Sequence, residues 1–447
     1  MMKYPIHLRD SLLKIGLITL FSCLLINLGY FTQRQSFGQL IGLYTGLFVL
    51  YYCLIYTFKN ARETIITGIF FRILLLFAIP ALSDDFYRFV WDGRLLSHGL
   101  NPYTTLPAEF VQSIDFKPII GDKSIFDKLN SPNYYTVYPP LNQFIFGISA
   151  WLSPNNLWLN VIFLRVFILS AEVGILLIIA KLSAKKIKLS SNPKVIALYA
   201  FNPLIIIELC GNLHFEGVVM FFVVWAFYVG IKERFQLIIS AFLFACAVCV
   251  KLLPLIFIPL IIKKIGFKKG IWYGALVATF CGLFFLPFLD KALIEKLFSS
   301  VNLYFQKFEF NASIYYLLRE VGYWIWGYNI IGFLGKTLAF ITFSSIILIS
   351  WKVKDIHQAA LFILTLYFAM ATTIHPWYAT NLLVIAIFTN FRYPILWSYT
   401  VFFSYAAYQT DLYQENLYLV ILEYVLVLGM MIYELKQVRN LFHDKSS

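Results

Sequence analysis

Apolar runs of helix length recur along almost the whole chain, and they constrain the fold more than any other feature. About fourteen of them can be read as membrane spans, since roughly 20 apolar residues cross a bilayer. They lack the ten-residue alternation typical of a transmembrane barrel. Hydrophobic residues make up 60% of the sequence and charged residues 13%, whereas about a quarter of a soluble domain is charged. We therefore expect an all-α, polytopic membrane protein that forms a single domain over residues 1–447.

The basic residues predict how these spans are oriented. The expected spans lie near 12–30, 38–58, 64–82, 157–181, 194–210, 215–231, two within 235–262, 270–289, 331–351, 357–374, 377–391, 394–410 and 416–434. Lys and Arg are enriched in cytoplasmic loops, which places the lysines between 181 and 194 inside. The apolar piece at 138–152 must then stay on the outer side, as a membrane-lying or re-entrant helix. Two outer loops follow, a catalytic one at about 83–156 and a second at about 290–330.

The net charge of +13 belongs to this pattern of orientation. Lys and Arg are scattered between apolar runs instead of forming a basic patch, so no nucleic-acid partner is expected. The apolar runs along the chain instead predict the lipid bilayer as a partner.

A stretch that is polar, charged and aromatic at once, SDDFYRFVWDGRLLSHGLNPY at residues 83–103, directly follows the third span. Asp84 and Asp85 are therefore predicted where a membrane helix meets water. Adjacent carboxylates repel each other and are poorly hydrated near an apolar boundary, so the pKa of one of them should rise. Such a carboxylate is a useful proton acceptor. The alternative is that Ser83 and Asp84 simply cap a helix.

The same stretch predicts a helix over Asp85–Ser97, with Gly99 as its stop signal. At helical spacing Asp84, Arg88 and Asp92 fall on one face, beside an aromatic stripe. A helix of this kind suits a position along the membrane surface. The alternative is a solvated face with internal ion pairs, which contribute little when exposed.

Most of the other unusual polar residues fall on the same predicted side of the membrane. Ionisable groups at membrane depth are costly, which makes them functional candidates. The set comprises Arg94, Tyr138, His214, Glu216, Lys251 and His375. Each has an alternative reading: His214 and Glu216 could merely end two helices, Lys251 could extend to the interface, and His375 could mark a helix terminus in an aromatic belt.

Carboxylates, cations and aromatic side chains on one face suit sugar transfer from a lipid-linked phosphosugar. The cations would hold the phosphate at the membrane surface. The aromatic side chains would stack on sugar rings, and a carboxylate would take the proton of an acceptor hydroxyl.

An ordered series of motifs resembles the GT-C superfamily of membrane glycosyltransferases, and in particular bacterial polyprenyl-phosphate-mannose-dependent α-mannopyranosyltransferases. The series comprises SDDFYRFVWDG, HGLNPY, YPPL, GNLHFEG, VKLLPLIFIPL and HPWY, within residues 64–391 or so. The resemblance implies that Asp84 and Asp85 supply the catalytic base. The sequence departs from the family pattern at Glu216, where Asp is more usual.

We therefore predict two groups of site residues besides the catalytic pair Asp84 and Asp85. The predicted contacts to the donor phosphate are Arg88, Arg94, Lys251 and His375. The predicted substrate contacts are Asn101, Tyr103, Tyr138, Asn212, His214, Glu216, Trp377 and Tyr378. No cofactor is firmly implied and no full metal-ligand set is visible, although the paired acids leave a divalent metal open.

The resulting hypothesis is a glycosyltransferase of the bacterial plasma (inner) membrane. It would move a hexose, expected to be mannose, from a polyprenyl-phosphate donor to a glycan or glycolipid acceptor on the outer face, in a single displacement with an Asp general base. The alternative is a multi-pass transporter or lipid-linked sugar flippase. Against that alternative, the sequence shows no internal repeat and its charged residues gather at one face. A polymerase or ligase of surface glycans is a third reading.

Overall fold

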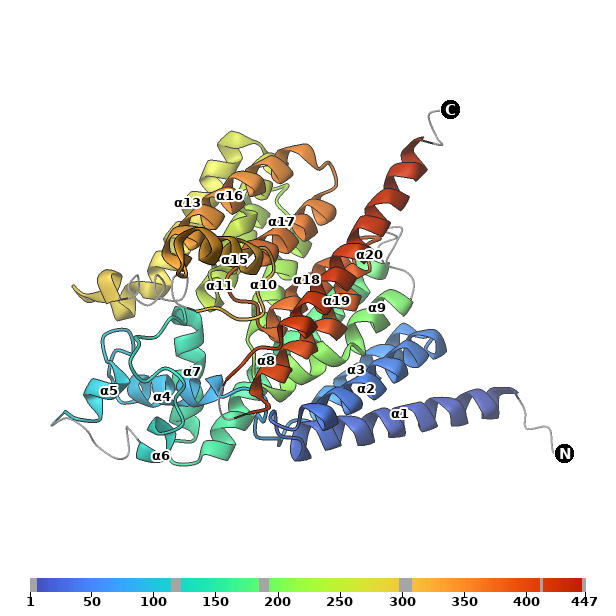
Figure 1. Cartoon of the computed structure of the whole chain (residues 1–447), viewed down its shortest axis with the longest axis horizontal. Coiled ribbons are helices and arrows are strands. Elements are labelled where there is room, and N and C mark those ends of the chain that lie inside the picture. Colours follow the sequence, from blue (N-terminus) through green and yellow to red (C-terminus); the bar gives the residue numbers. More distant parts are fainter. Residues whose placement is uncertain (1–5, 114–121, 185–192, 297–307, 411–412, 444–447) are drawn as a thin grey trace. The chain divides into compact units, whose positions relative to one another are not determined.

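The computed structural model describes residues 6–113, 122–184, 193–296, 308–410 and 413–443. Over these ranges the chain is built of helices joined by loops, and no β-strand forms (Figure 1). Within them, β pairing is limited to an isolated bridge between Phe310 and Thr373. The predicted all-α class is confirmed.

Six of the described helices are long and apolar enough to cross a membrane. They are α1 (Ile6–Phe31), α2 (Phe37–Thr57), α8 (Leu157–Ala184), α13 (Phe267–Phe285), α16 (Ile331–Lys352) and α20 (Leu417–His443). A seventh span results if α9 (Pro193–Ala200) and η1 (Ile205–Gly211), which are bent by 49°, are counted together. The chain is a multi-pass membrane protein, but the expected number of about fourteen spans is not confirmed.

Several predicted spans form helices that are shorter than this criterion requires. They include α3 (Ala61–Ile73), α10 (Glu216–Val229), α11 (Arg234–Val250), α17 (Ile356–Met370), α18 (Ala379–Ala386) and α19 (Tyr393–Thr400). The predicted break within 235–262 is confirmed, because Lys251 has an extended backbone that ends α11. Beyond it, η2 (Leu253–Phe257) leads into α12 (Ile258–Ile265).

The chain divides into two compact units, each made of segments that are separated in sequence. The first comprises residues 1–71, 180–206 and 309–447, and the second comprises 72–179 and 207–308. The expectation of a single domain over residues 1–447 stays a prediction. The lysines at 185–188 and the part of the second outer loop at 297–307 lie outside the described residues.

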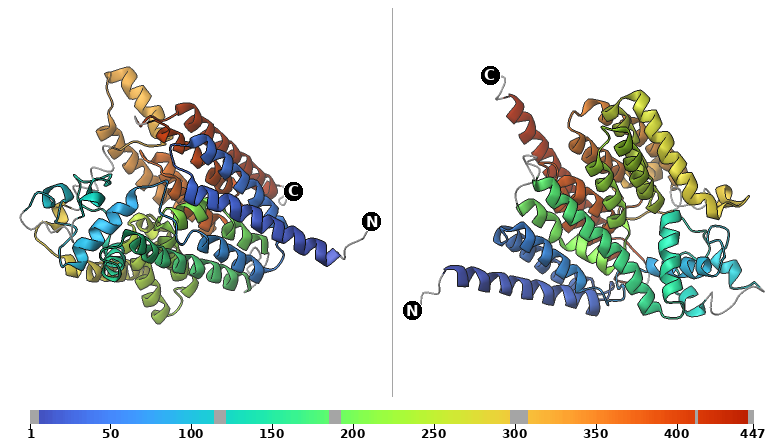
Figure 2. Two further views of the ribbon diagram at one scale, coloured as in Figure 1. Left: turned by 90° about the horizontal axis from the view of Figure 1, so that it is seen from below. Right: turned by 180° about the vertical axis from the view of Figure 1, so that it is seen from behind.

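In the first unit α1 pairs with α2, α16 with α17, and α19 with α20 (Figure 2). Its remaining elements are α15 (Ile314–Trp326), η4 (Pro376–Tyr378) and η5 (Val401–Tyr408). Residues far apart in sequence meet in its core: the Tyr44 ring stacks on Phe402 with centroids 3.6 Å apart, and Tyr51 Oη donates to the carbonyl of Leu198 at 2.8 Å.

In the second unit α4 and α7 form a tightly packed pair. The pair consists of α4 (Asp85–Ser97) and α7 (Pro140–Leu152), and the same unit contains α5 (Pro107–Phe110), α6 (Lys123–Phe126) and η3 (Leu286–Phe288). A Cβ at Gly93 would overlap the carbonyl oxygen of Phe146, and one at Gly147 would lie 2.8 Å from Leu96 Cδ2. At Gly93 the contact is with backbone, so only glycine lets the helices approach this closely there, whereas at Gly147 the contact is with the flexible end of a side chain.

Both helices of this pair were predicted, and α4 has the predicted bounds. The α4 helix spans Asp85–Ser97, and Gly99 follows with φ +79°, a left-handed conformation suited to glycine. The predicted helix within 138–152 is α7, which has Pro140 in its first turn. Its 13 residues give it a length of about 20 Å, which is too short to span a bilayer.

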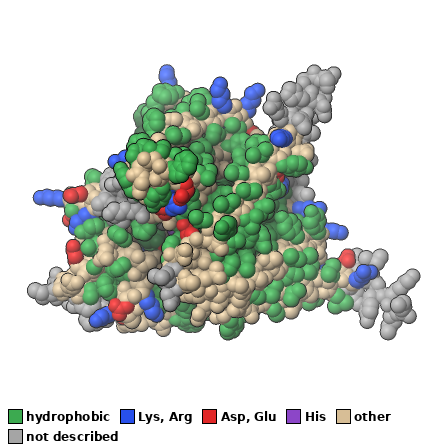
Figure 3. Space-filling model, in the orientation of Figure 1, with side chains coloured by type: hydrophobic (Ala, Val, Ile, Leu, Met, Phe, Trp, Pro, Cys, Tyr) green, Lys and Arg blue, Asp and Glu red, His purple; other side chains and the backbone are tan. Residues whose placement is uncertain are grey.

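Large hydrophobic side chains are widely exposed, as expected for surfaces that face lipid. Figure 3 shows hydrophobic side chains over much of the visible surface, with charged ones sparse between them. Trp324 is 95% exposed and Trp272 is 71% exposed. Apolar surface of this extent requires a membrane or a partner to cover it.

Candidate active site

The two adjacent aspartates lie at the start of α4 in the second unit. Asp84 occupies the position that precedes the helix, but its side chain makes no capping hydrogen bond. The Asp85 amide instead donates to Ser83 Oγ at 3.4 Å. The Asp84 carboxylate is therefore not used as a helix cap.

The Asp85 carboxylate is held by a hydrogen bond from another side chain. It is partly buried, and Asn130 Nδ2 donates to its Oδ1 at 2.8 Å. Burial raises the pKa of Asp85 above its ordinary value; Asn130 and Lys251 partly offset this, while Glu216 and Asp84 add to it. The rise agrees with the sequence-based expectation, but its main cause is burial and not the neighbouring Asp84.

Lys251 and Glu216 form an ion pair in the same unit. Glu216 is the first residue of α10 and is buried, while Lys251 follows the last turn of α11 and its side chain is 36% exposed. The Lys251 Nζ donates to Glu216 Oε1. Because the side chain of Lys251 is still partly accessible, its ammonium can contact a ligand as well as Glu216.

Asn212 and His214 converge on a carboxylate that the sequence analysis did not single out, Glu208. Asn212 Nδ2 donates to Glu208 Oε2 at 3.1 Å, and His214 Nε2 lies 3.6 Å from the same oxygen. Asn212 Oδ1 also accepts from the Leu82 amide at 3.3 Å, which ties this cluster to the backbone just before the aspartates. An acidic residue inside the apolar run at 194–210 was the signal for Glu208, since buried charges are costly.

Arg88 is buried, and much of its guanidinium is occupied by contacts within the protein. Its Nε donates to Asp92 Oδ1 at 2.7 Å, as their spacing on one helical face predicted. Its Nη1 donates to the backbone carbonyls of Ser131 and Tyr134. Arg94 is also buried and lies 3.5 Å from Asp122. Contacts of both arginines to a phosphate stay a prediction, and their surroundings favour a structural role.

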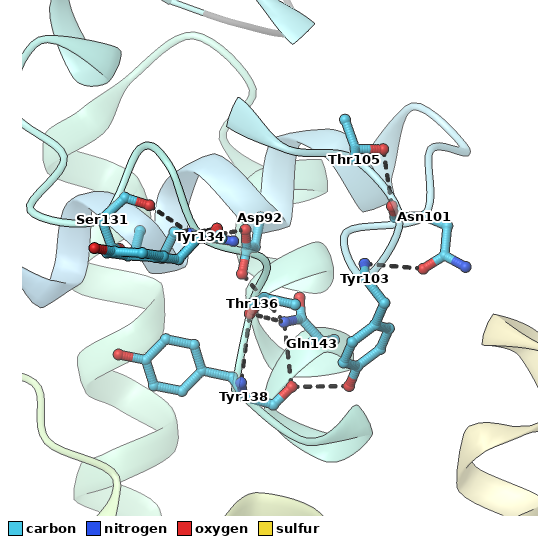
Figure 4. A network of polar contacts seen from close by, with 10 residues as sticks. Asp92, Asn101, Tyr103, Thr105, Ser131, Tyr134, Thr136, Tyr138 and Gln143 are labelled. Carbon is cyan, nitrogen blue, oxygen red and sulfur yellow. Dashed lines mark hydrogen bonds and ion pairs between the residues drawn. The ribbon is translucent and has the colours of Figure 1, made fainter. Parts of the chain in front are cut away.

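Asn101, Tyr103 and Tyr138 are linked to one another by hydrogen bonds (Figure 4). Asn101 Oδ1 accepts from the Tyr103 amide at 3.0 Å, and its Nδ2 donates to the carbonyl of Phe288 at 3.0 Å. The Tyr103 hydroxyl donates to the carbonyl of Tyr138 at 2.8 Å. Tyr103 is fully buried, so its side chain holds the loop together, while Tyr138 is only partly buried.

His375, Trp377 and Tyr378 belong to the first unit and gather around η4. The rings of His375 and Trp377 are stacked with centroids 4.3 Å apart, and Phe310 lies 4.8 Å from His375 on centroids. Tyr378 meets the imidazole edge-on. The structure thus brings these three predicted residues together as one aromatic cluster.

The described side chains contain no group of three or more His, Cys, Asp or Glu residues placed to hold a metal ion. The Asp84–Asp85 pair is accordingly not part of a larger ligand set over these ranges.

Comparison with known proteins identifies the family. The family model described as alpha-(1->6)-mannopyranosyltransferase, N-terminal domain, matches residues 21–265, which is more than half of the chain. A similar protein is alpha-(1->6)-mannopyranosyltransferase A of Corynebacterium glutamicum, 26% identical over 190 residues. That match covers 42% of this chain and 36% of the relative, so the chain spans little more than a third of the relative's length. No solved structure matches.

The matched segment contains Asp84, Asp85, Glu208, Glu216 and Lys251, all of which the structure places around the start of α4 or in the clusters linked to it. The resemblance to membrane mannosyltransferases noted in the sequence is therefore confirmed. The chain belongs to the alpha-(1->6)-mannopyranosyltransferase family.

Proposed function

We propose that the protein transfers a mannosyl residue from a polyprenyl-phosphate donor to the 6-hydroxyl of an acceptor mannoside, on the outer face of the bacterial plasma membrane. The family description supports the sugar and the bond formed. The apolar helices support a lipid-linked donor, because such a donor diffuses in the bilayer. The glycan or glycolipid acceptor provides the attacking hydroxyl.

The observation that carries the proposal is the environment of Asp85. Its carboxylate is partly buried, bonded through one oxygen to Asn130, and close enough to Lys251 and Glu216 for both to affect its pKa. A carboxylate with a raised pKa is well matched to accept a proton near neutral pH. Lys251 provides a partly exposed cation within electrostatic range of it.

The chemistry follows from these groups. The acceptor oxygen forms a bond to the anomeric carbon, its proton passes to Asp85, and the bond from the anomeric carbon to the phosphate oxygen breaks. The lipid phosphate leaves with that electron pair, and Lys251 stabilises the charge that develops on it. A single displacement inverts the anomeric carbon, so an α-linked product requires a β-linked donor.

We expect Asp85→Asn to lower kcat by about a hundred- to ten-thousand-fold, because it preserves shape and removes the proton acceptor. The test is mannosyl transfer from polyprenyl-phosphate mannose to an alkyl α-mannoside by the purified full-length protein. The matched control is Asp127→Asn, an exposed aspartate on the same loop. Wild-type turnover by folded Asp85→Asn would refute the proposed function of this site.

A further inference from the structure

Asp85 takes its hydrogen bond from a side chain 45 positions later in the sequence. Asn130 lies on the outer loop and is exposed, with its amide nitrogen 2.8 Å from Asp85 Oδ1. An exposed loop residue holds such a position only if the backbone around it is fixed. The contacts that fix this backbone are therefore part of the environment of the carboxylate.

Arg88 fixes that backbone from the same helix that carries Asp85. Its Nη1 donates to the carbonyl of Ser131 at 3.1 Å, directly after Asn130 in the chain, and to that of Tyr134 at 2.9 Å, four residues after Asn130. One turn of α4 thus separates the carboxylate from the guanidinium that holds the loop above it. Arg88 thus links the loop to the helix that carries the carboxylate.

The guanidinium is itself held by a buried network, of which Figure 4 shows Asp92, Gln143 and Thr136. Arg88 Nε donates to Asp92 Oδ1, and Gln143 Nε2 of α7 donates to Asp92 Oδ2 at 3.2 Å. Gln143 Nε2 also lies 3.0 Å from Thr136 Oγ1 on the returning loop. Asp92 and Gln143 are fully buried, so this network is shielded from water and keeps one geometry.

We propose that Asn130 is a positioning residue for the Asp85 carboxylate, held in place by Arg88 and its buried partners Asp92 and Gln143. This inference rests on the proposed function, in which Asp85 is the base. The Asn130 amide occupies Oδ1 and leaves Oδ2 to accept the proton of the acceptor hydroxyl. It also stabilises the anion, which opposes the effect of burial on the pKa of Asp85.

Other charged groups act on Asp85 and would remain in an Asn130 variant. They are Lys251 at the end of α11, Glu216 at the start of α10, and Asp84 before α4. Lys251 favours the anion, and the two carboxylates disfavour it. These three groups are the same in wild type and in the Asn130 variant. A difference between the two pH profiles of kcat therefore measures the effect of losing the Asn130 amide.

The experiment compares pH profiles of kcat for Asn130→Ala and wild type, using polyprenyl-phosphate mannose and full-length protein. Loss of a hydrogen bond to a charged group should move the acid limb upward by about one pH unit and lower kcat below it by about tenfold. The donor KM should not change. Asn133→Ala, an exposed amide three residues further along, serves as the control and should match wild type.

A double-variant cycle tests the anchoring by Arg88. Arg88→Lys keeps the charge next to Asp92, but an ammonium cannot reproduce the planar fork that reaches two carbonyls. If Arg88 acts through Asn130, the double variant should have the same acid limb as Asn130→Ala alone. Shifts that add would overturn the anchoring, and an Asn130→Ala profile identical to wild type would overturn the whole inference. Activity of Asp85→Asn distinguishes these failures from failure of the proposed base.

Discussion

Arg88 and Lys251 show that two cations predicted to have the same role can have different structural environments. Both lie near the predicted site and both were predicted to contact the donor phosphate. Arg88 is 3% exposed and bonded to Asp92 and two carbonyls, whereas the Lys251 side chain is 36% exposed. The sequence predicted the Arg88–Asp92 pair from its spacing, but not the loop carbonyls, because contacts across 43 residues leave no local pattern.

We expect these two residues to respond differently to truncation. Lys251→Ala should raise the donor KM by about tenfold or more, because it removes a charge-assisted contact to phosphate. Arg88→Ala should instead mainly destabilise the protein, by about 3–5 kcal/mol, since Asp92 would be left buried without its partner and two loop carbonyls would lose their donor. Lys251→Ala also leaves the buried Glu216 without its partner, so the donor KM is measured on the folded variant. Donor titrations and thermal unfolding in detergent separate the effects. Lys251→Arg, which keeps the charge, should restore most of the affinity; unchanged donor KM in Lys251→Ala would exclude the contact.

At the scale of elements, the sequence predicts best where a local signal marks a boundary. The helix Asp85–Ser97 was predicted to the residue, because Gly99 ends it in a left-handed conformation. The region 194–210 was predicted as one span, but it contains a bend and the π-helical turn η1. Apolar periodicity cannot distinguish that turn from α-helix. The sequence analysis therefore missed that Glu208 is buried within the protein.

The contact between α4 and α7 gives a prediction at this scale. Gly93→Ala should destabilise the protein by about 1–3 kcal/mol, because its Cβ would overlap the Phe146 backbone and a backbone cannot rotate away as a side chain can. Gly274→Ala in α13 is the control, since nothing lies within 4 Å of the added carbon. Midpoints of thermal unfolding measure both. Equal midpoints for Gly93→Ala and wild type would mean that the helices are not packed this closely.

For the whole molecule, the composition and the apolar runs suffice to predict a helical multi-pass membrane protein. They do not predict the number of spans, because several apolar runs are bent, broken or shortened in the structure. The division into two units was also not predicted. The division depends on which distant segments pack together; for example, Asn202 Nδ2 donates to Ser398 Oγ at 3.0 Å. Apolar runs do not indicate which helix packs against which.

The predicted orientation can be tested with exposed positions of the second unit. With Cys23 and Cys53 replaced by serine, a cysteine at Asn133 should react with a membrane-impermeant maleimide added outside cells. A cysteine at Lys268, which lies at the start of α13, should react only after the membrane is opened. The reason is the concentration of basic residues on the cytoplasmic side. Labelling of position 268 from outside would reverse the predicted topology.

The division of the chain has a consequence for its biosynthesis. The segment shared with the family ends at residue 265, yet it includes parts of both compact units and completes neither. The first unit needs residues 309–447, because Tyr44 and Asn202 pack against Phe402 and Ser398, and the second needs α13 against α11. The second core can therefore close only after residue 308 has been made, and the first only after nearly the entire polypeptide has been made. The earliest helices must wait in the bilayer for partners made last, and the matched segment at residues 21–265 cannot be expected to fold as an isolated fragment.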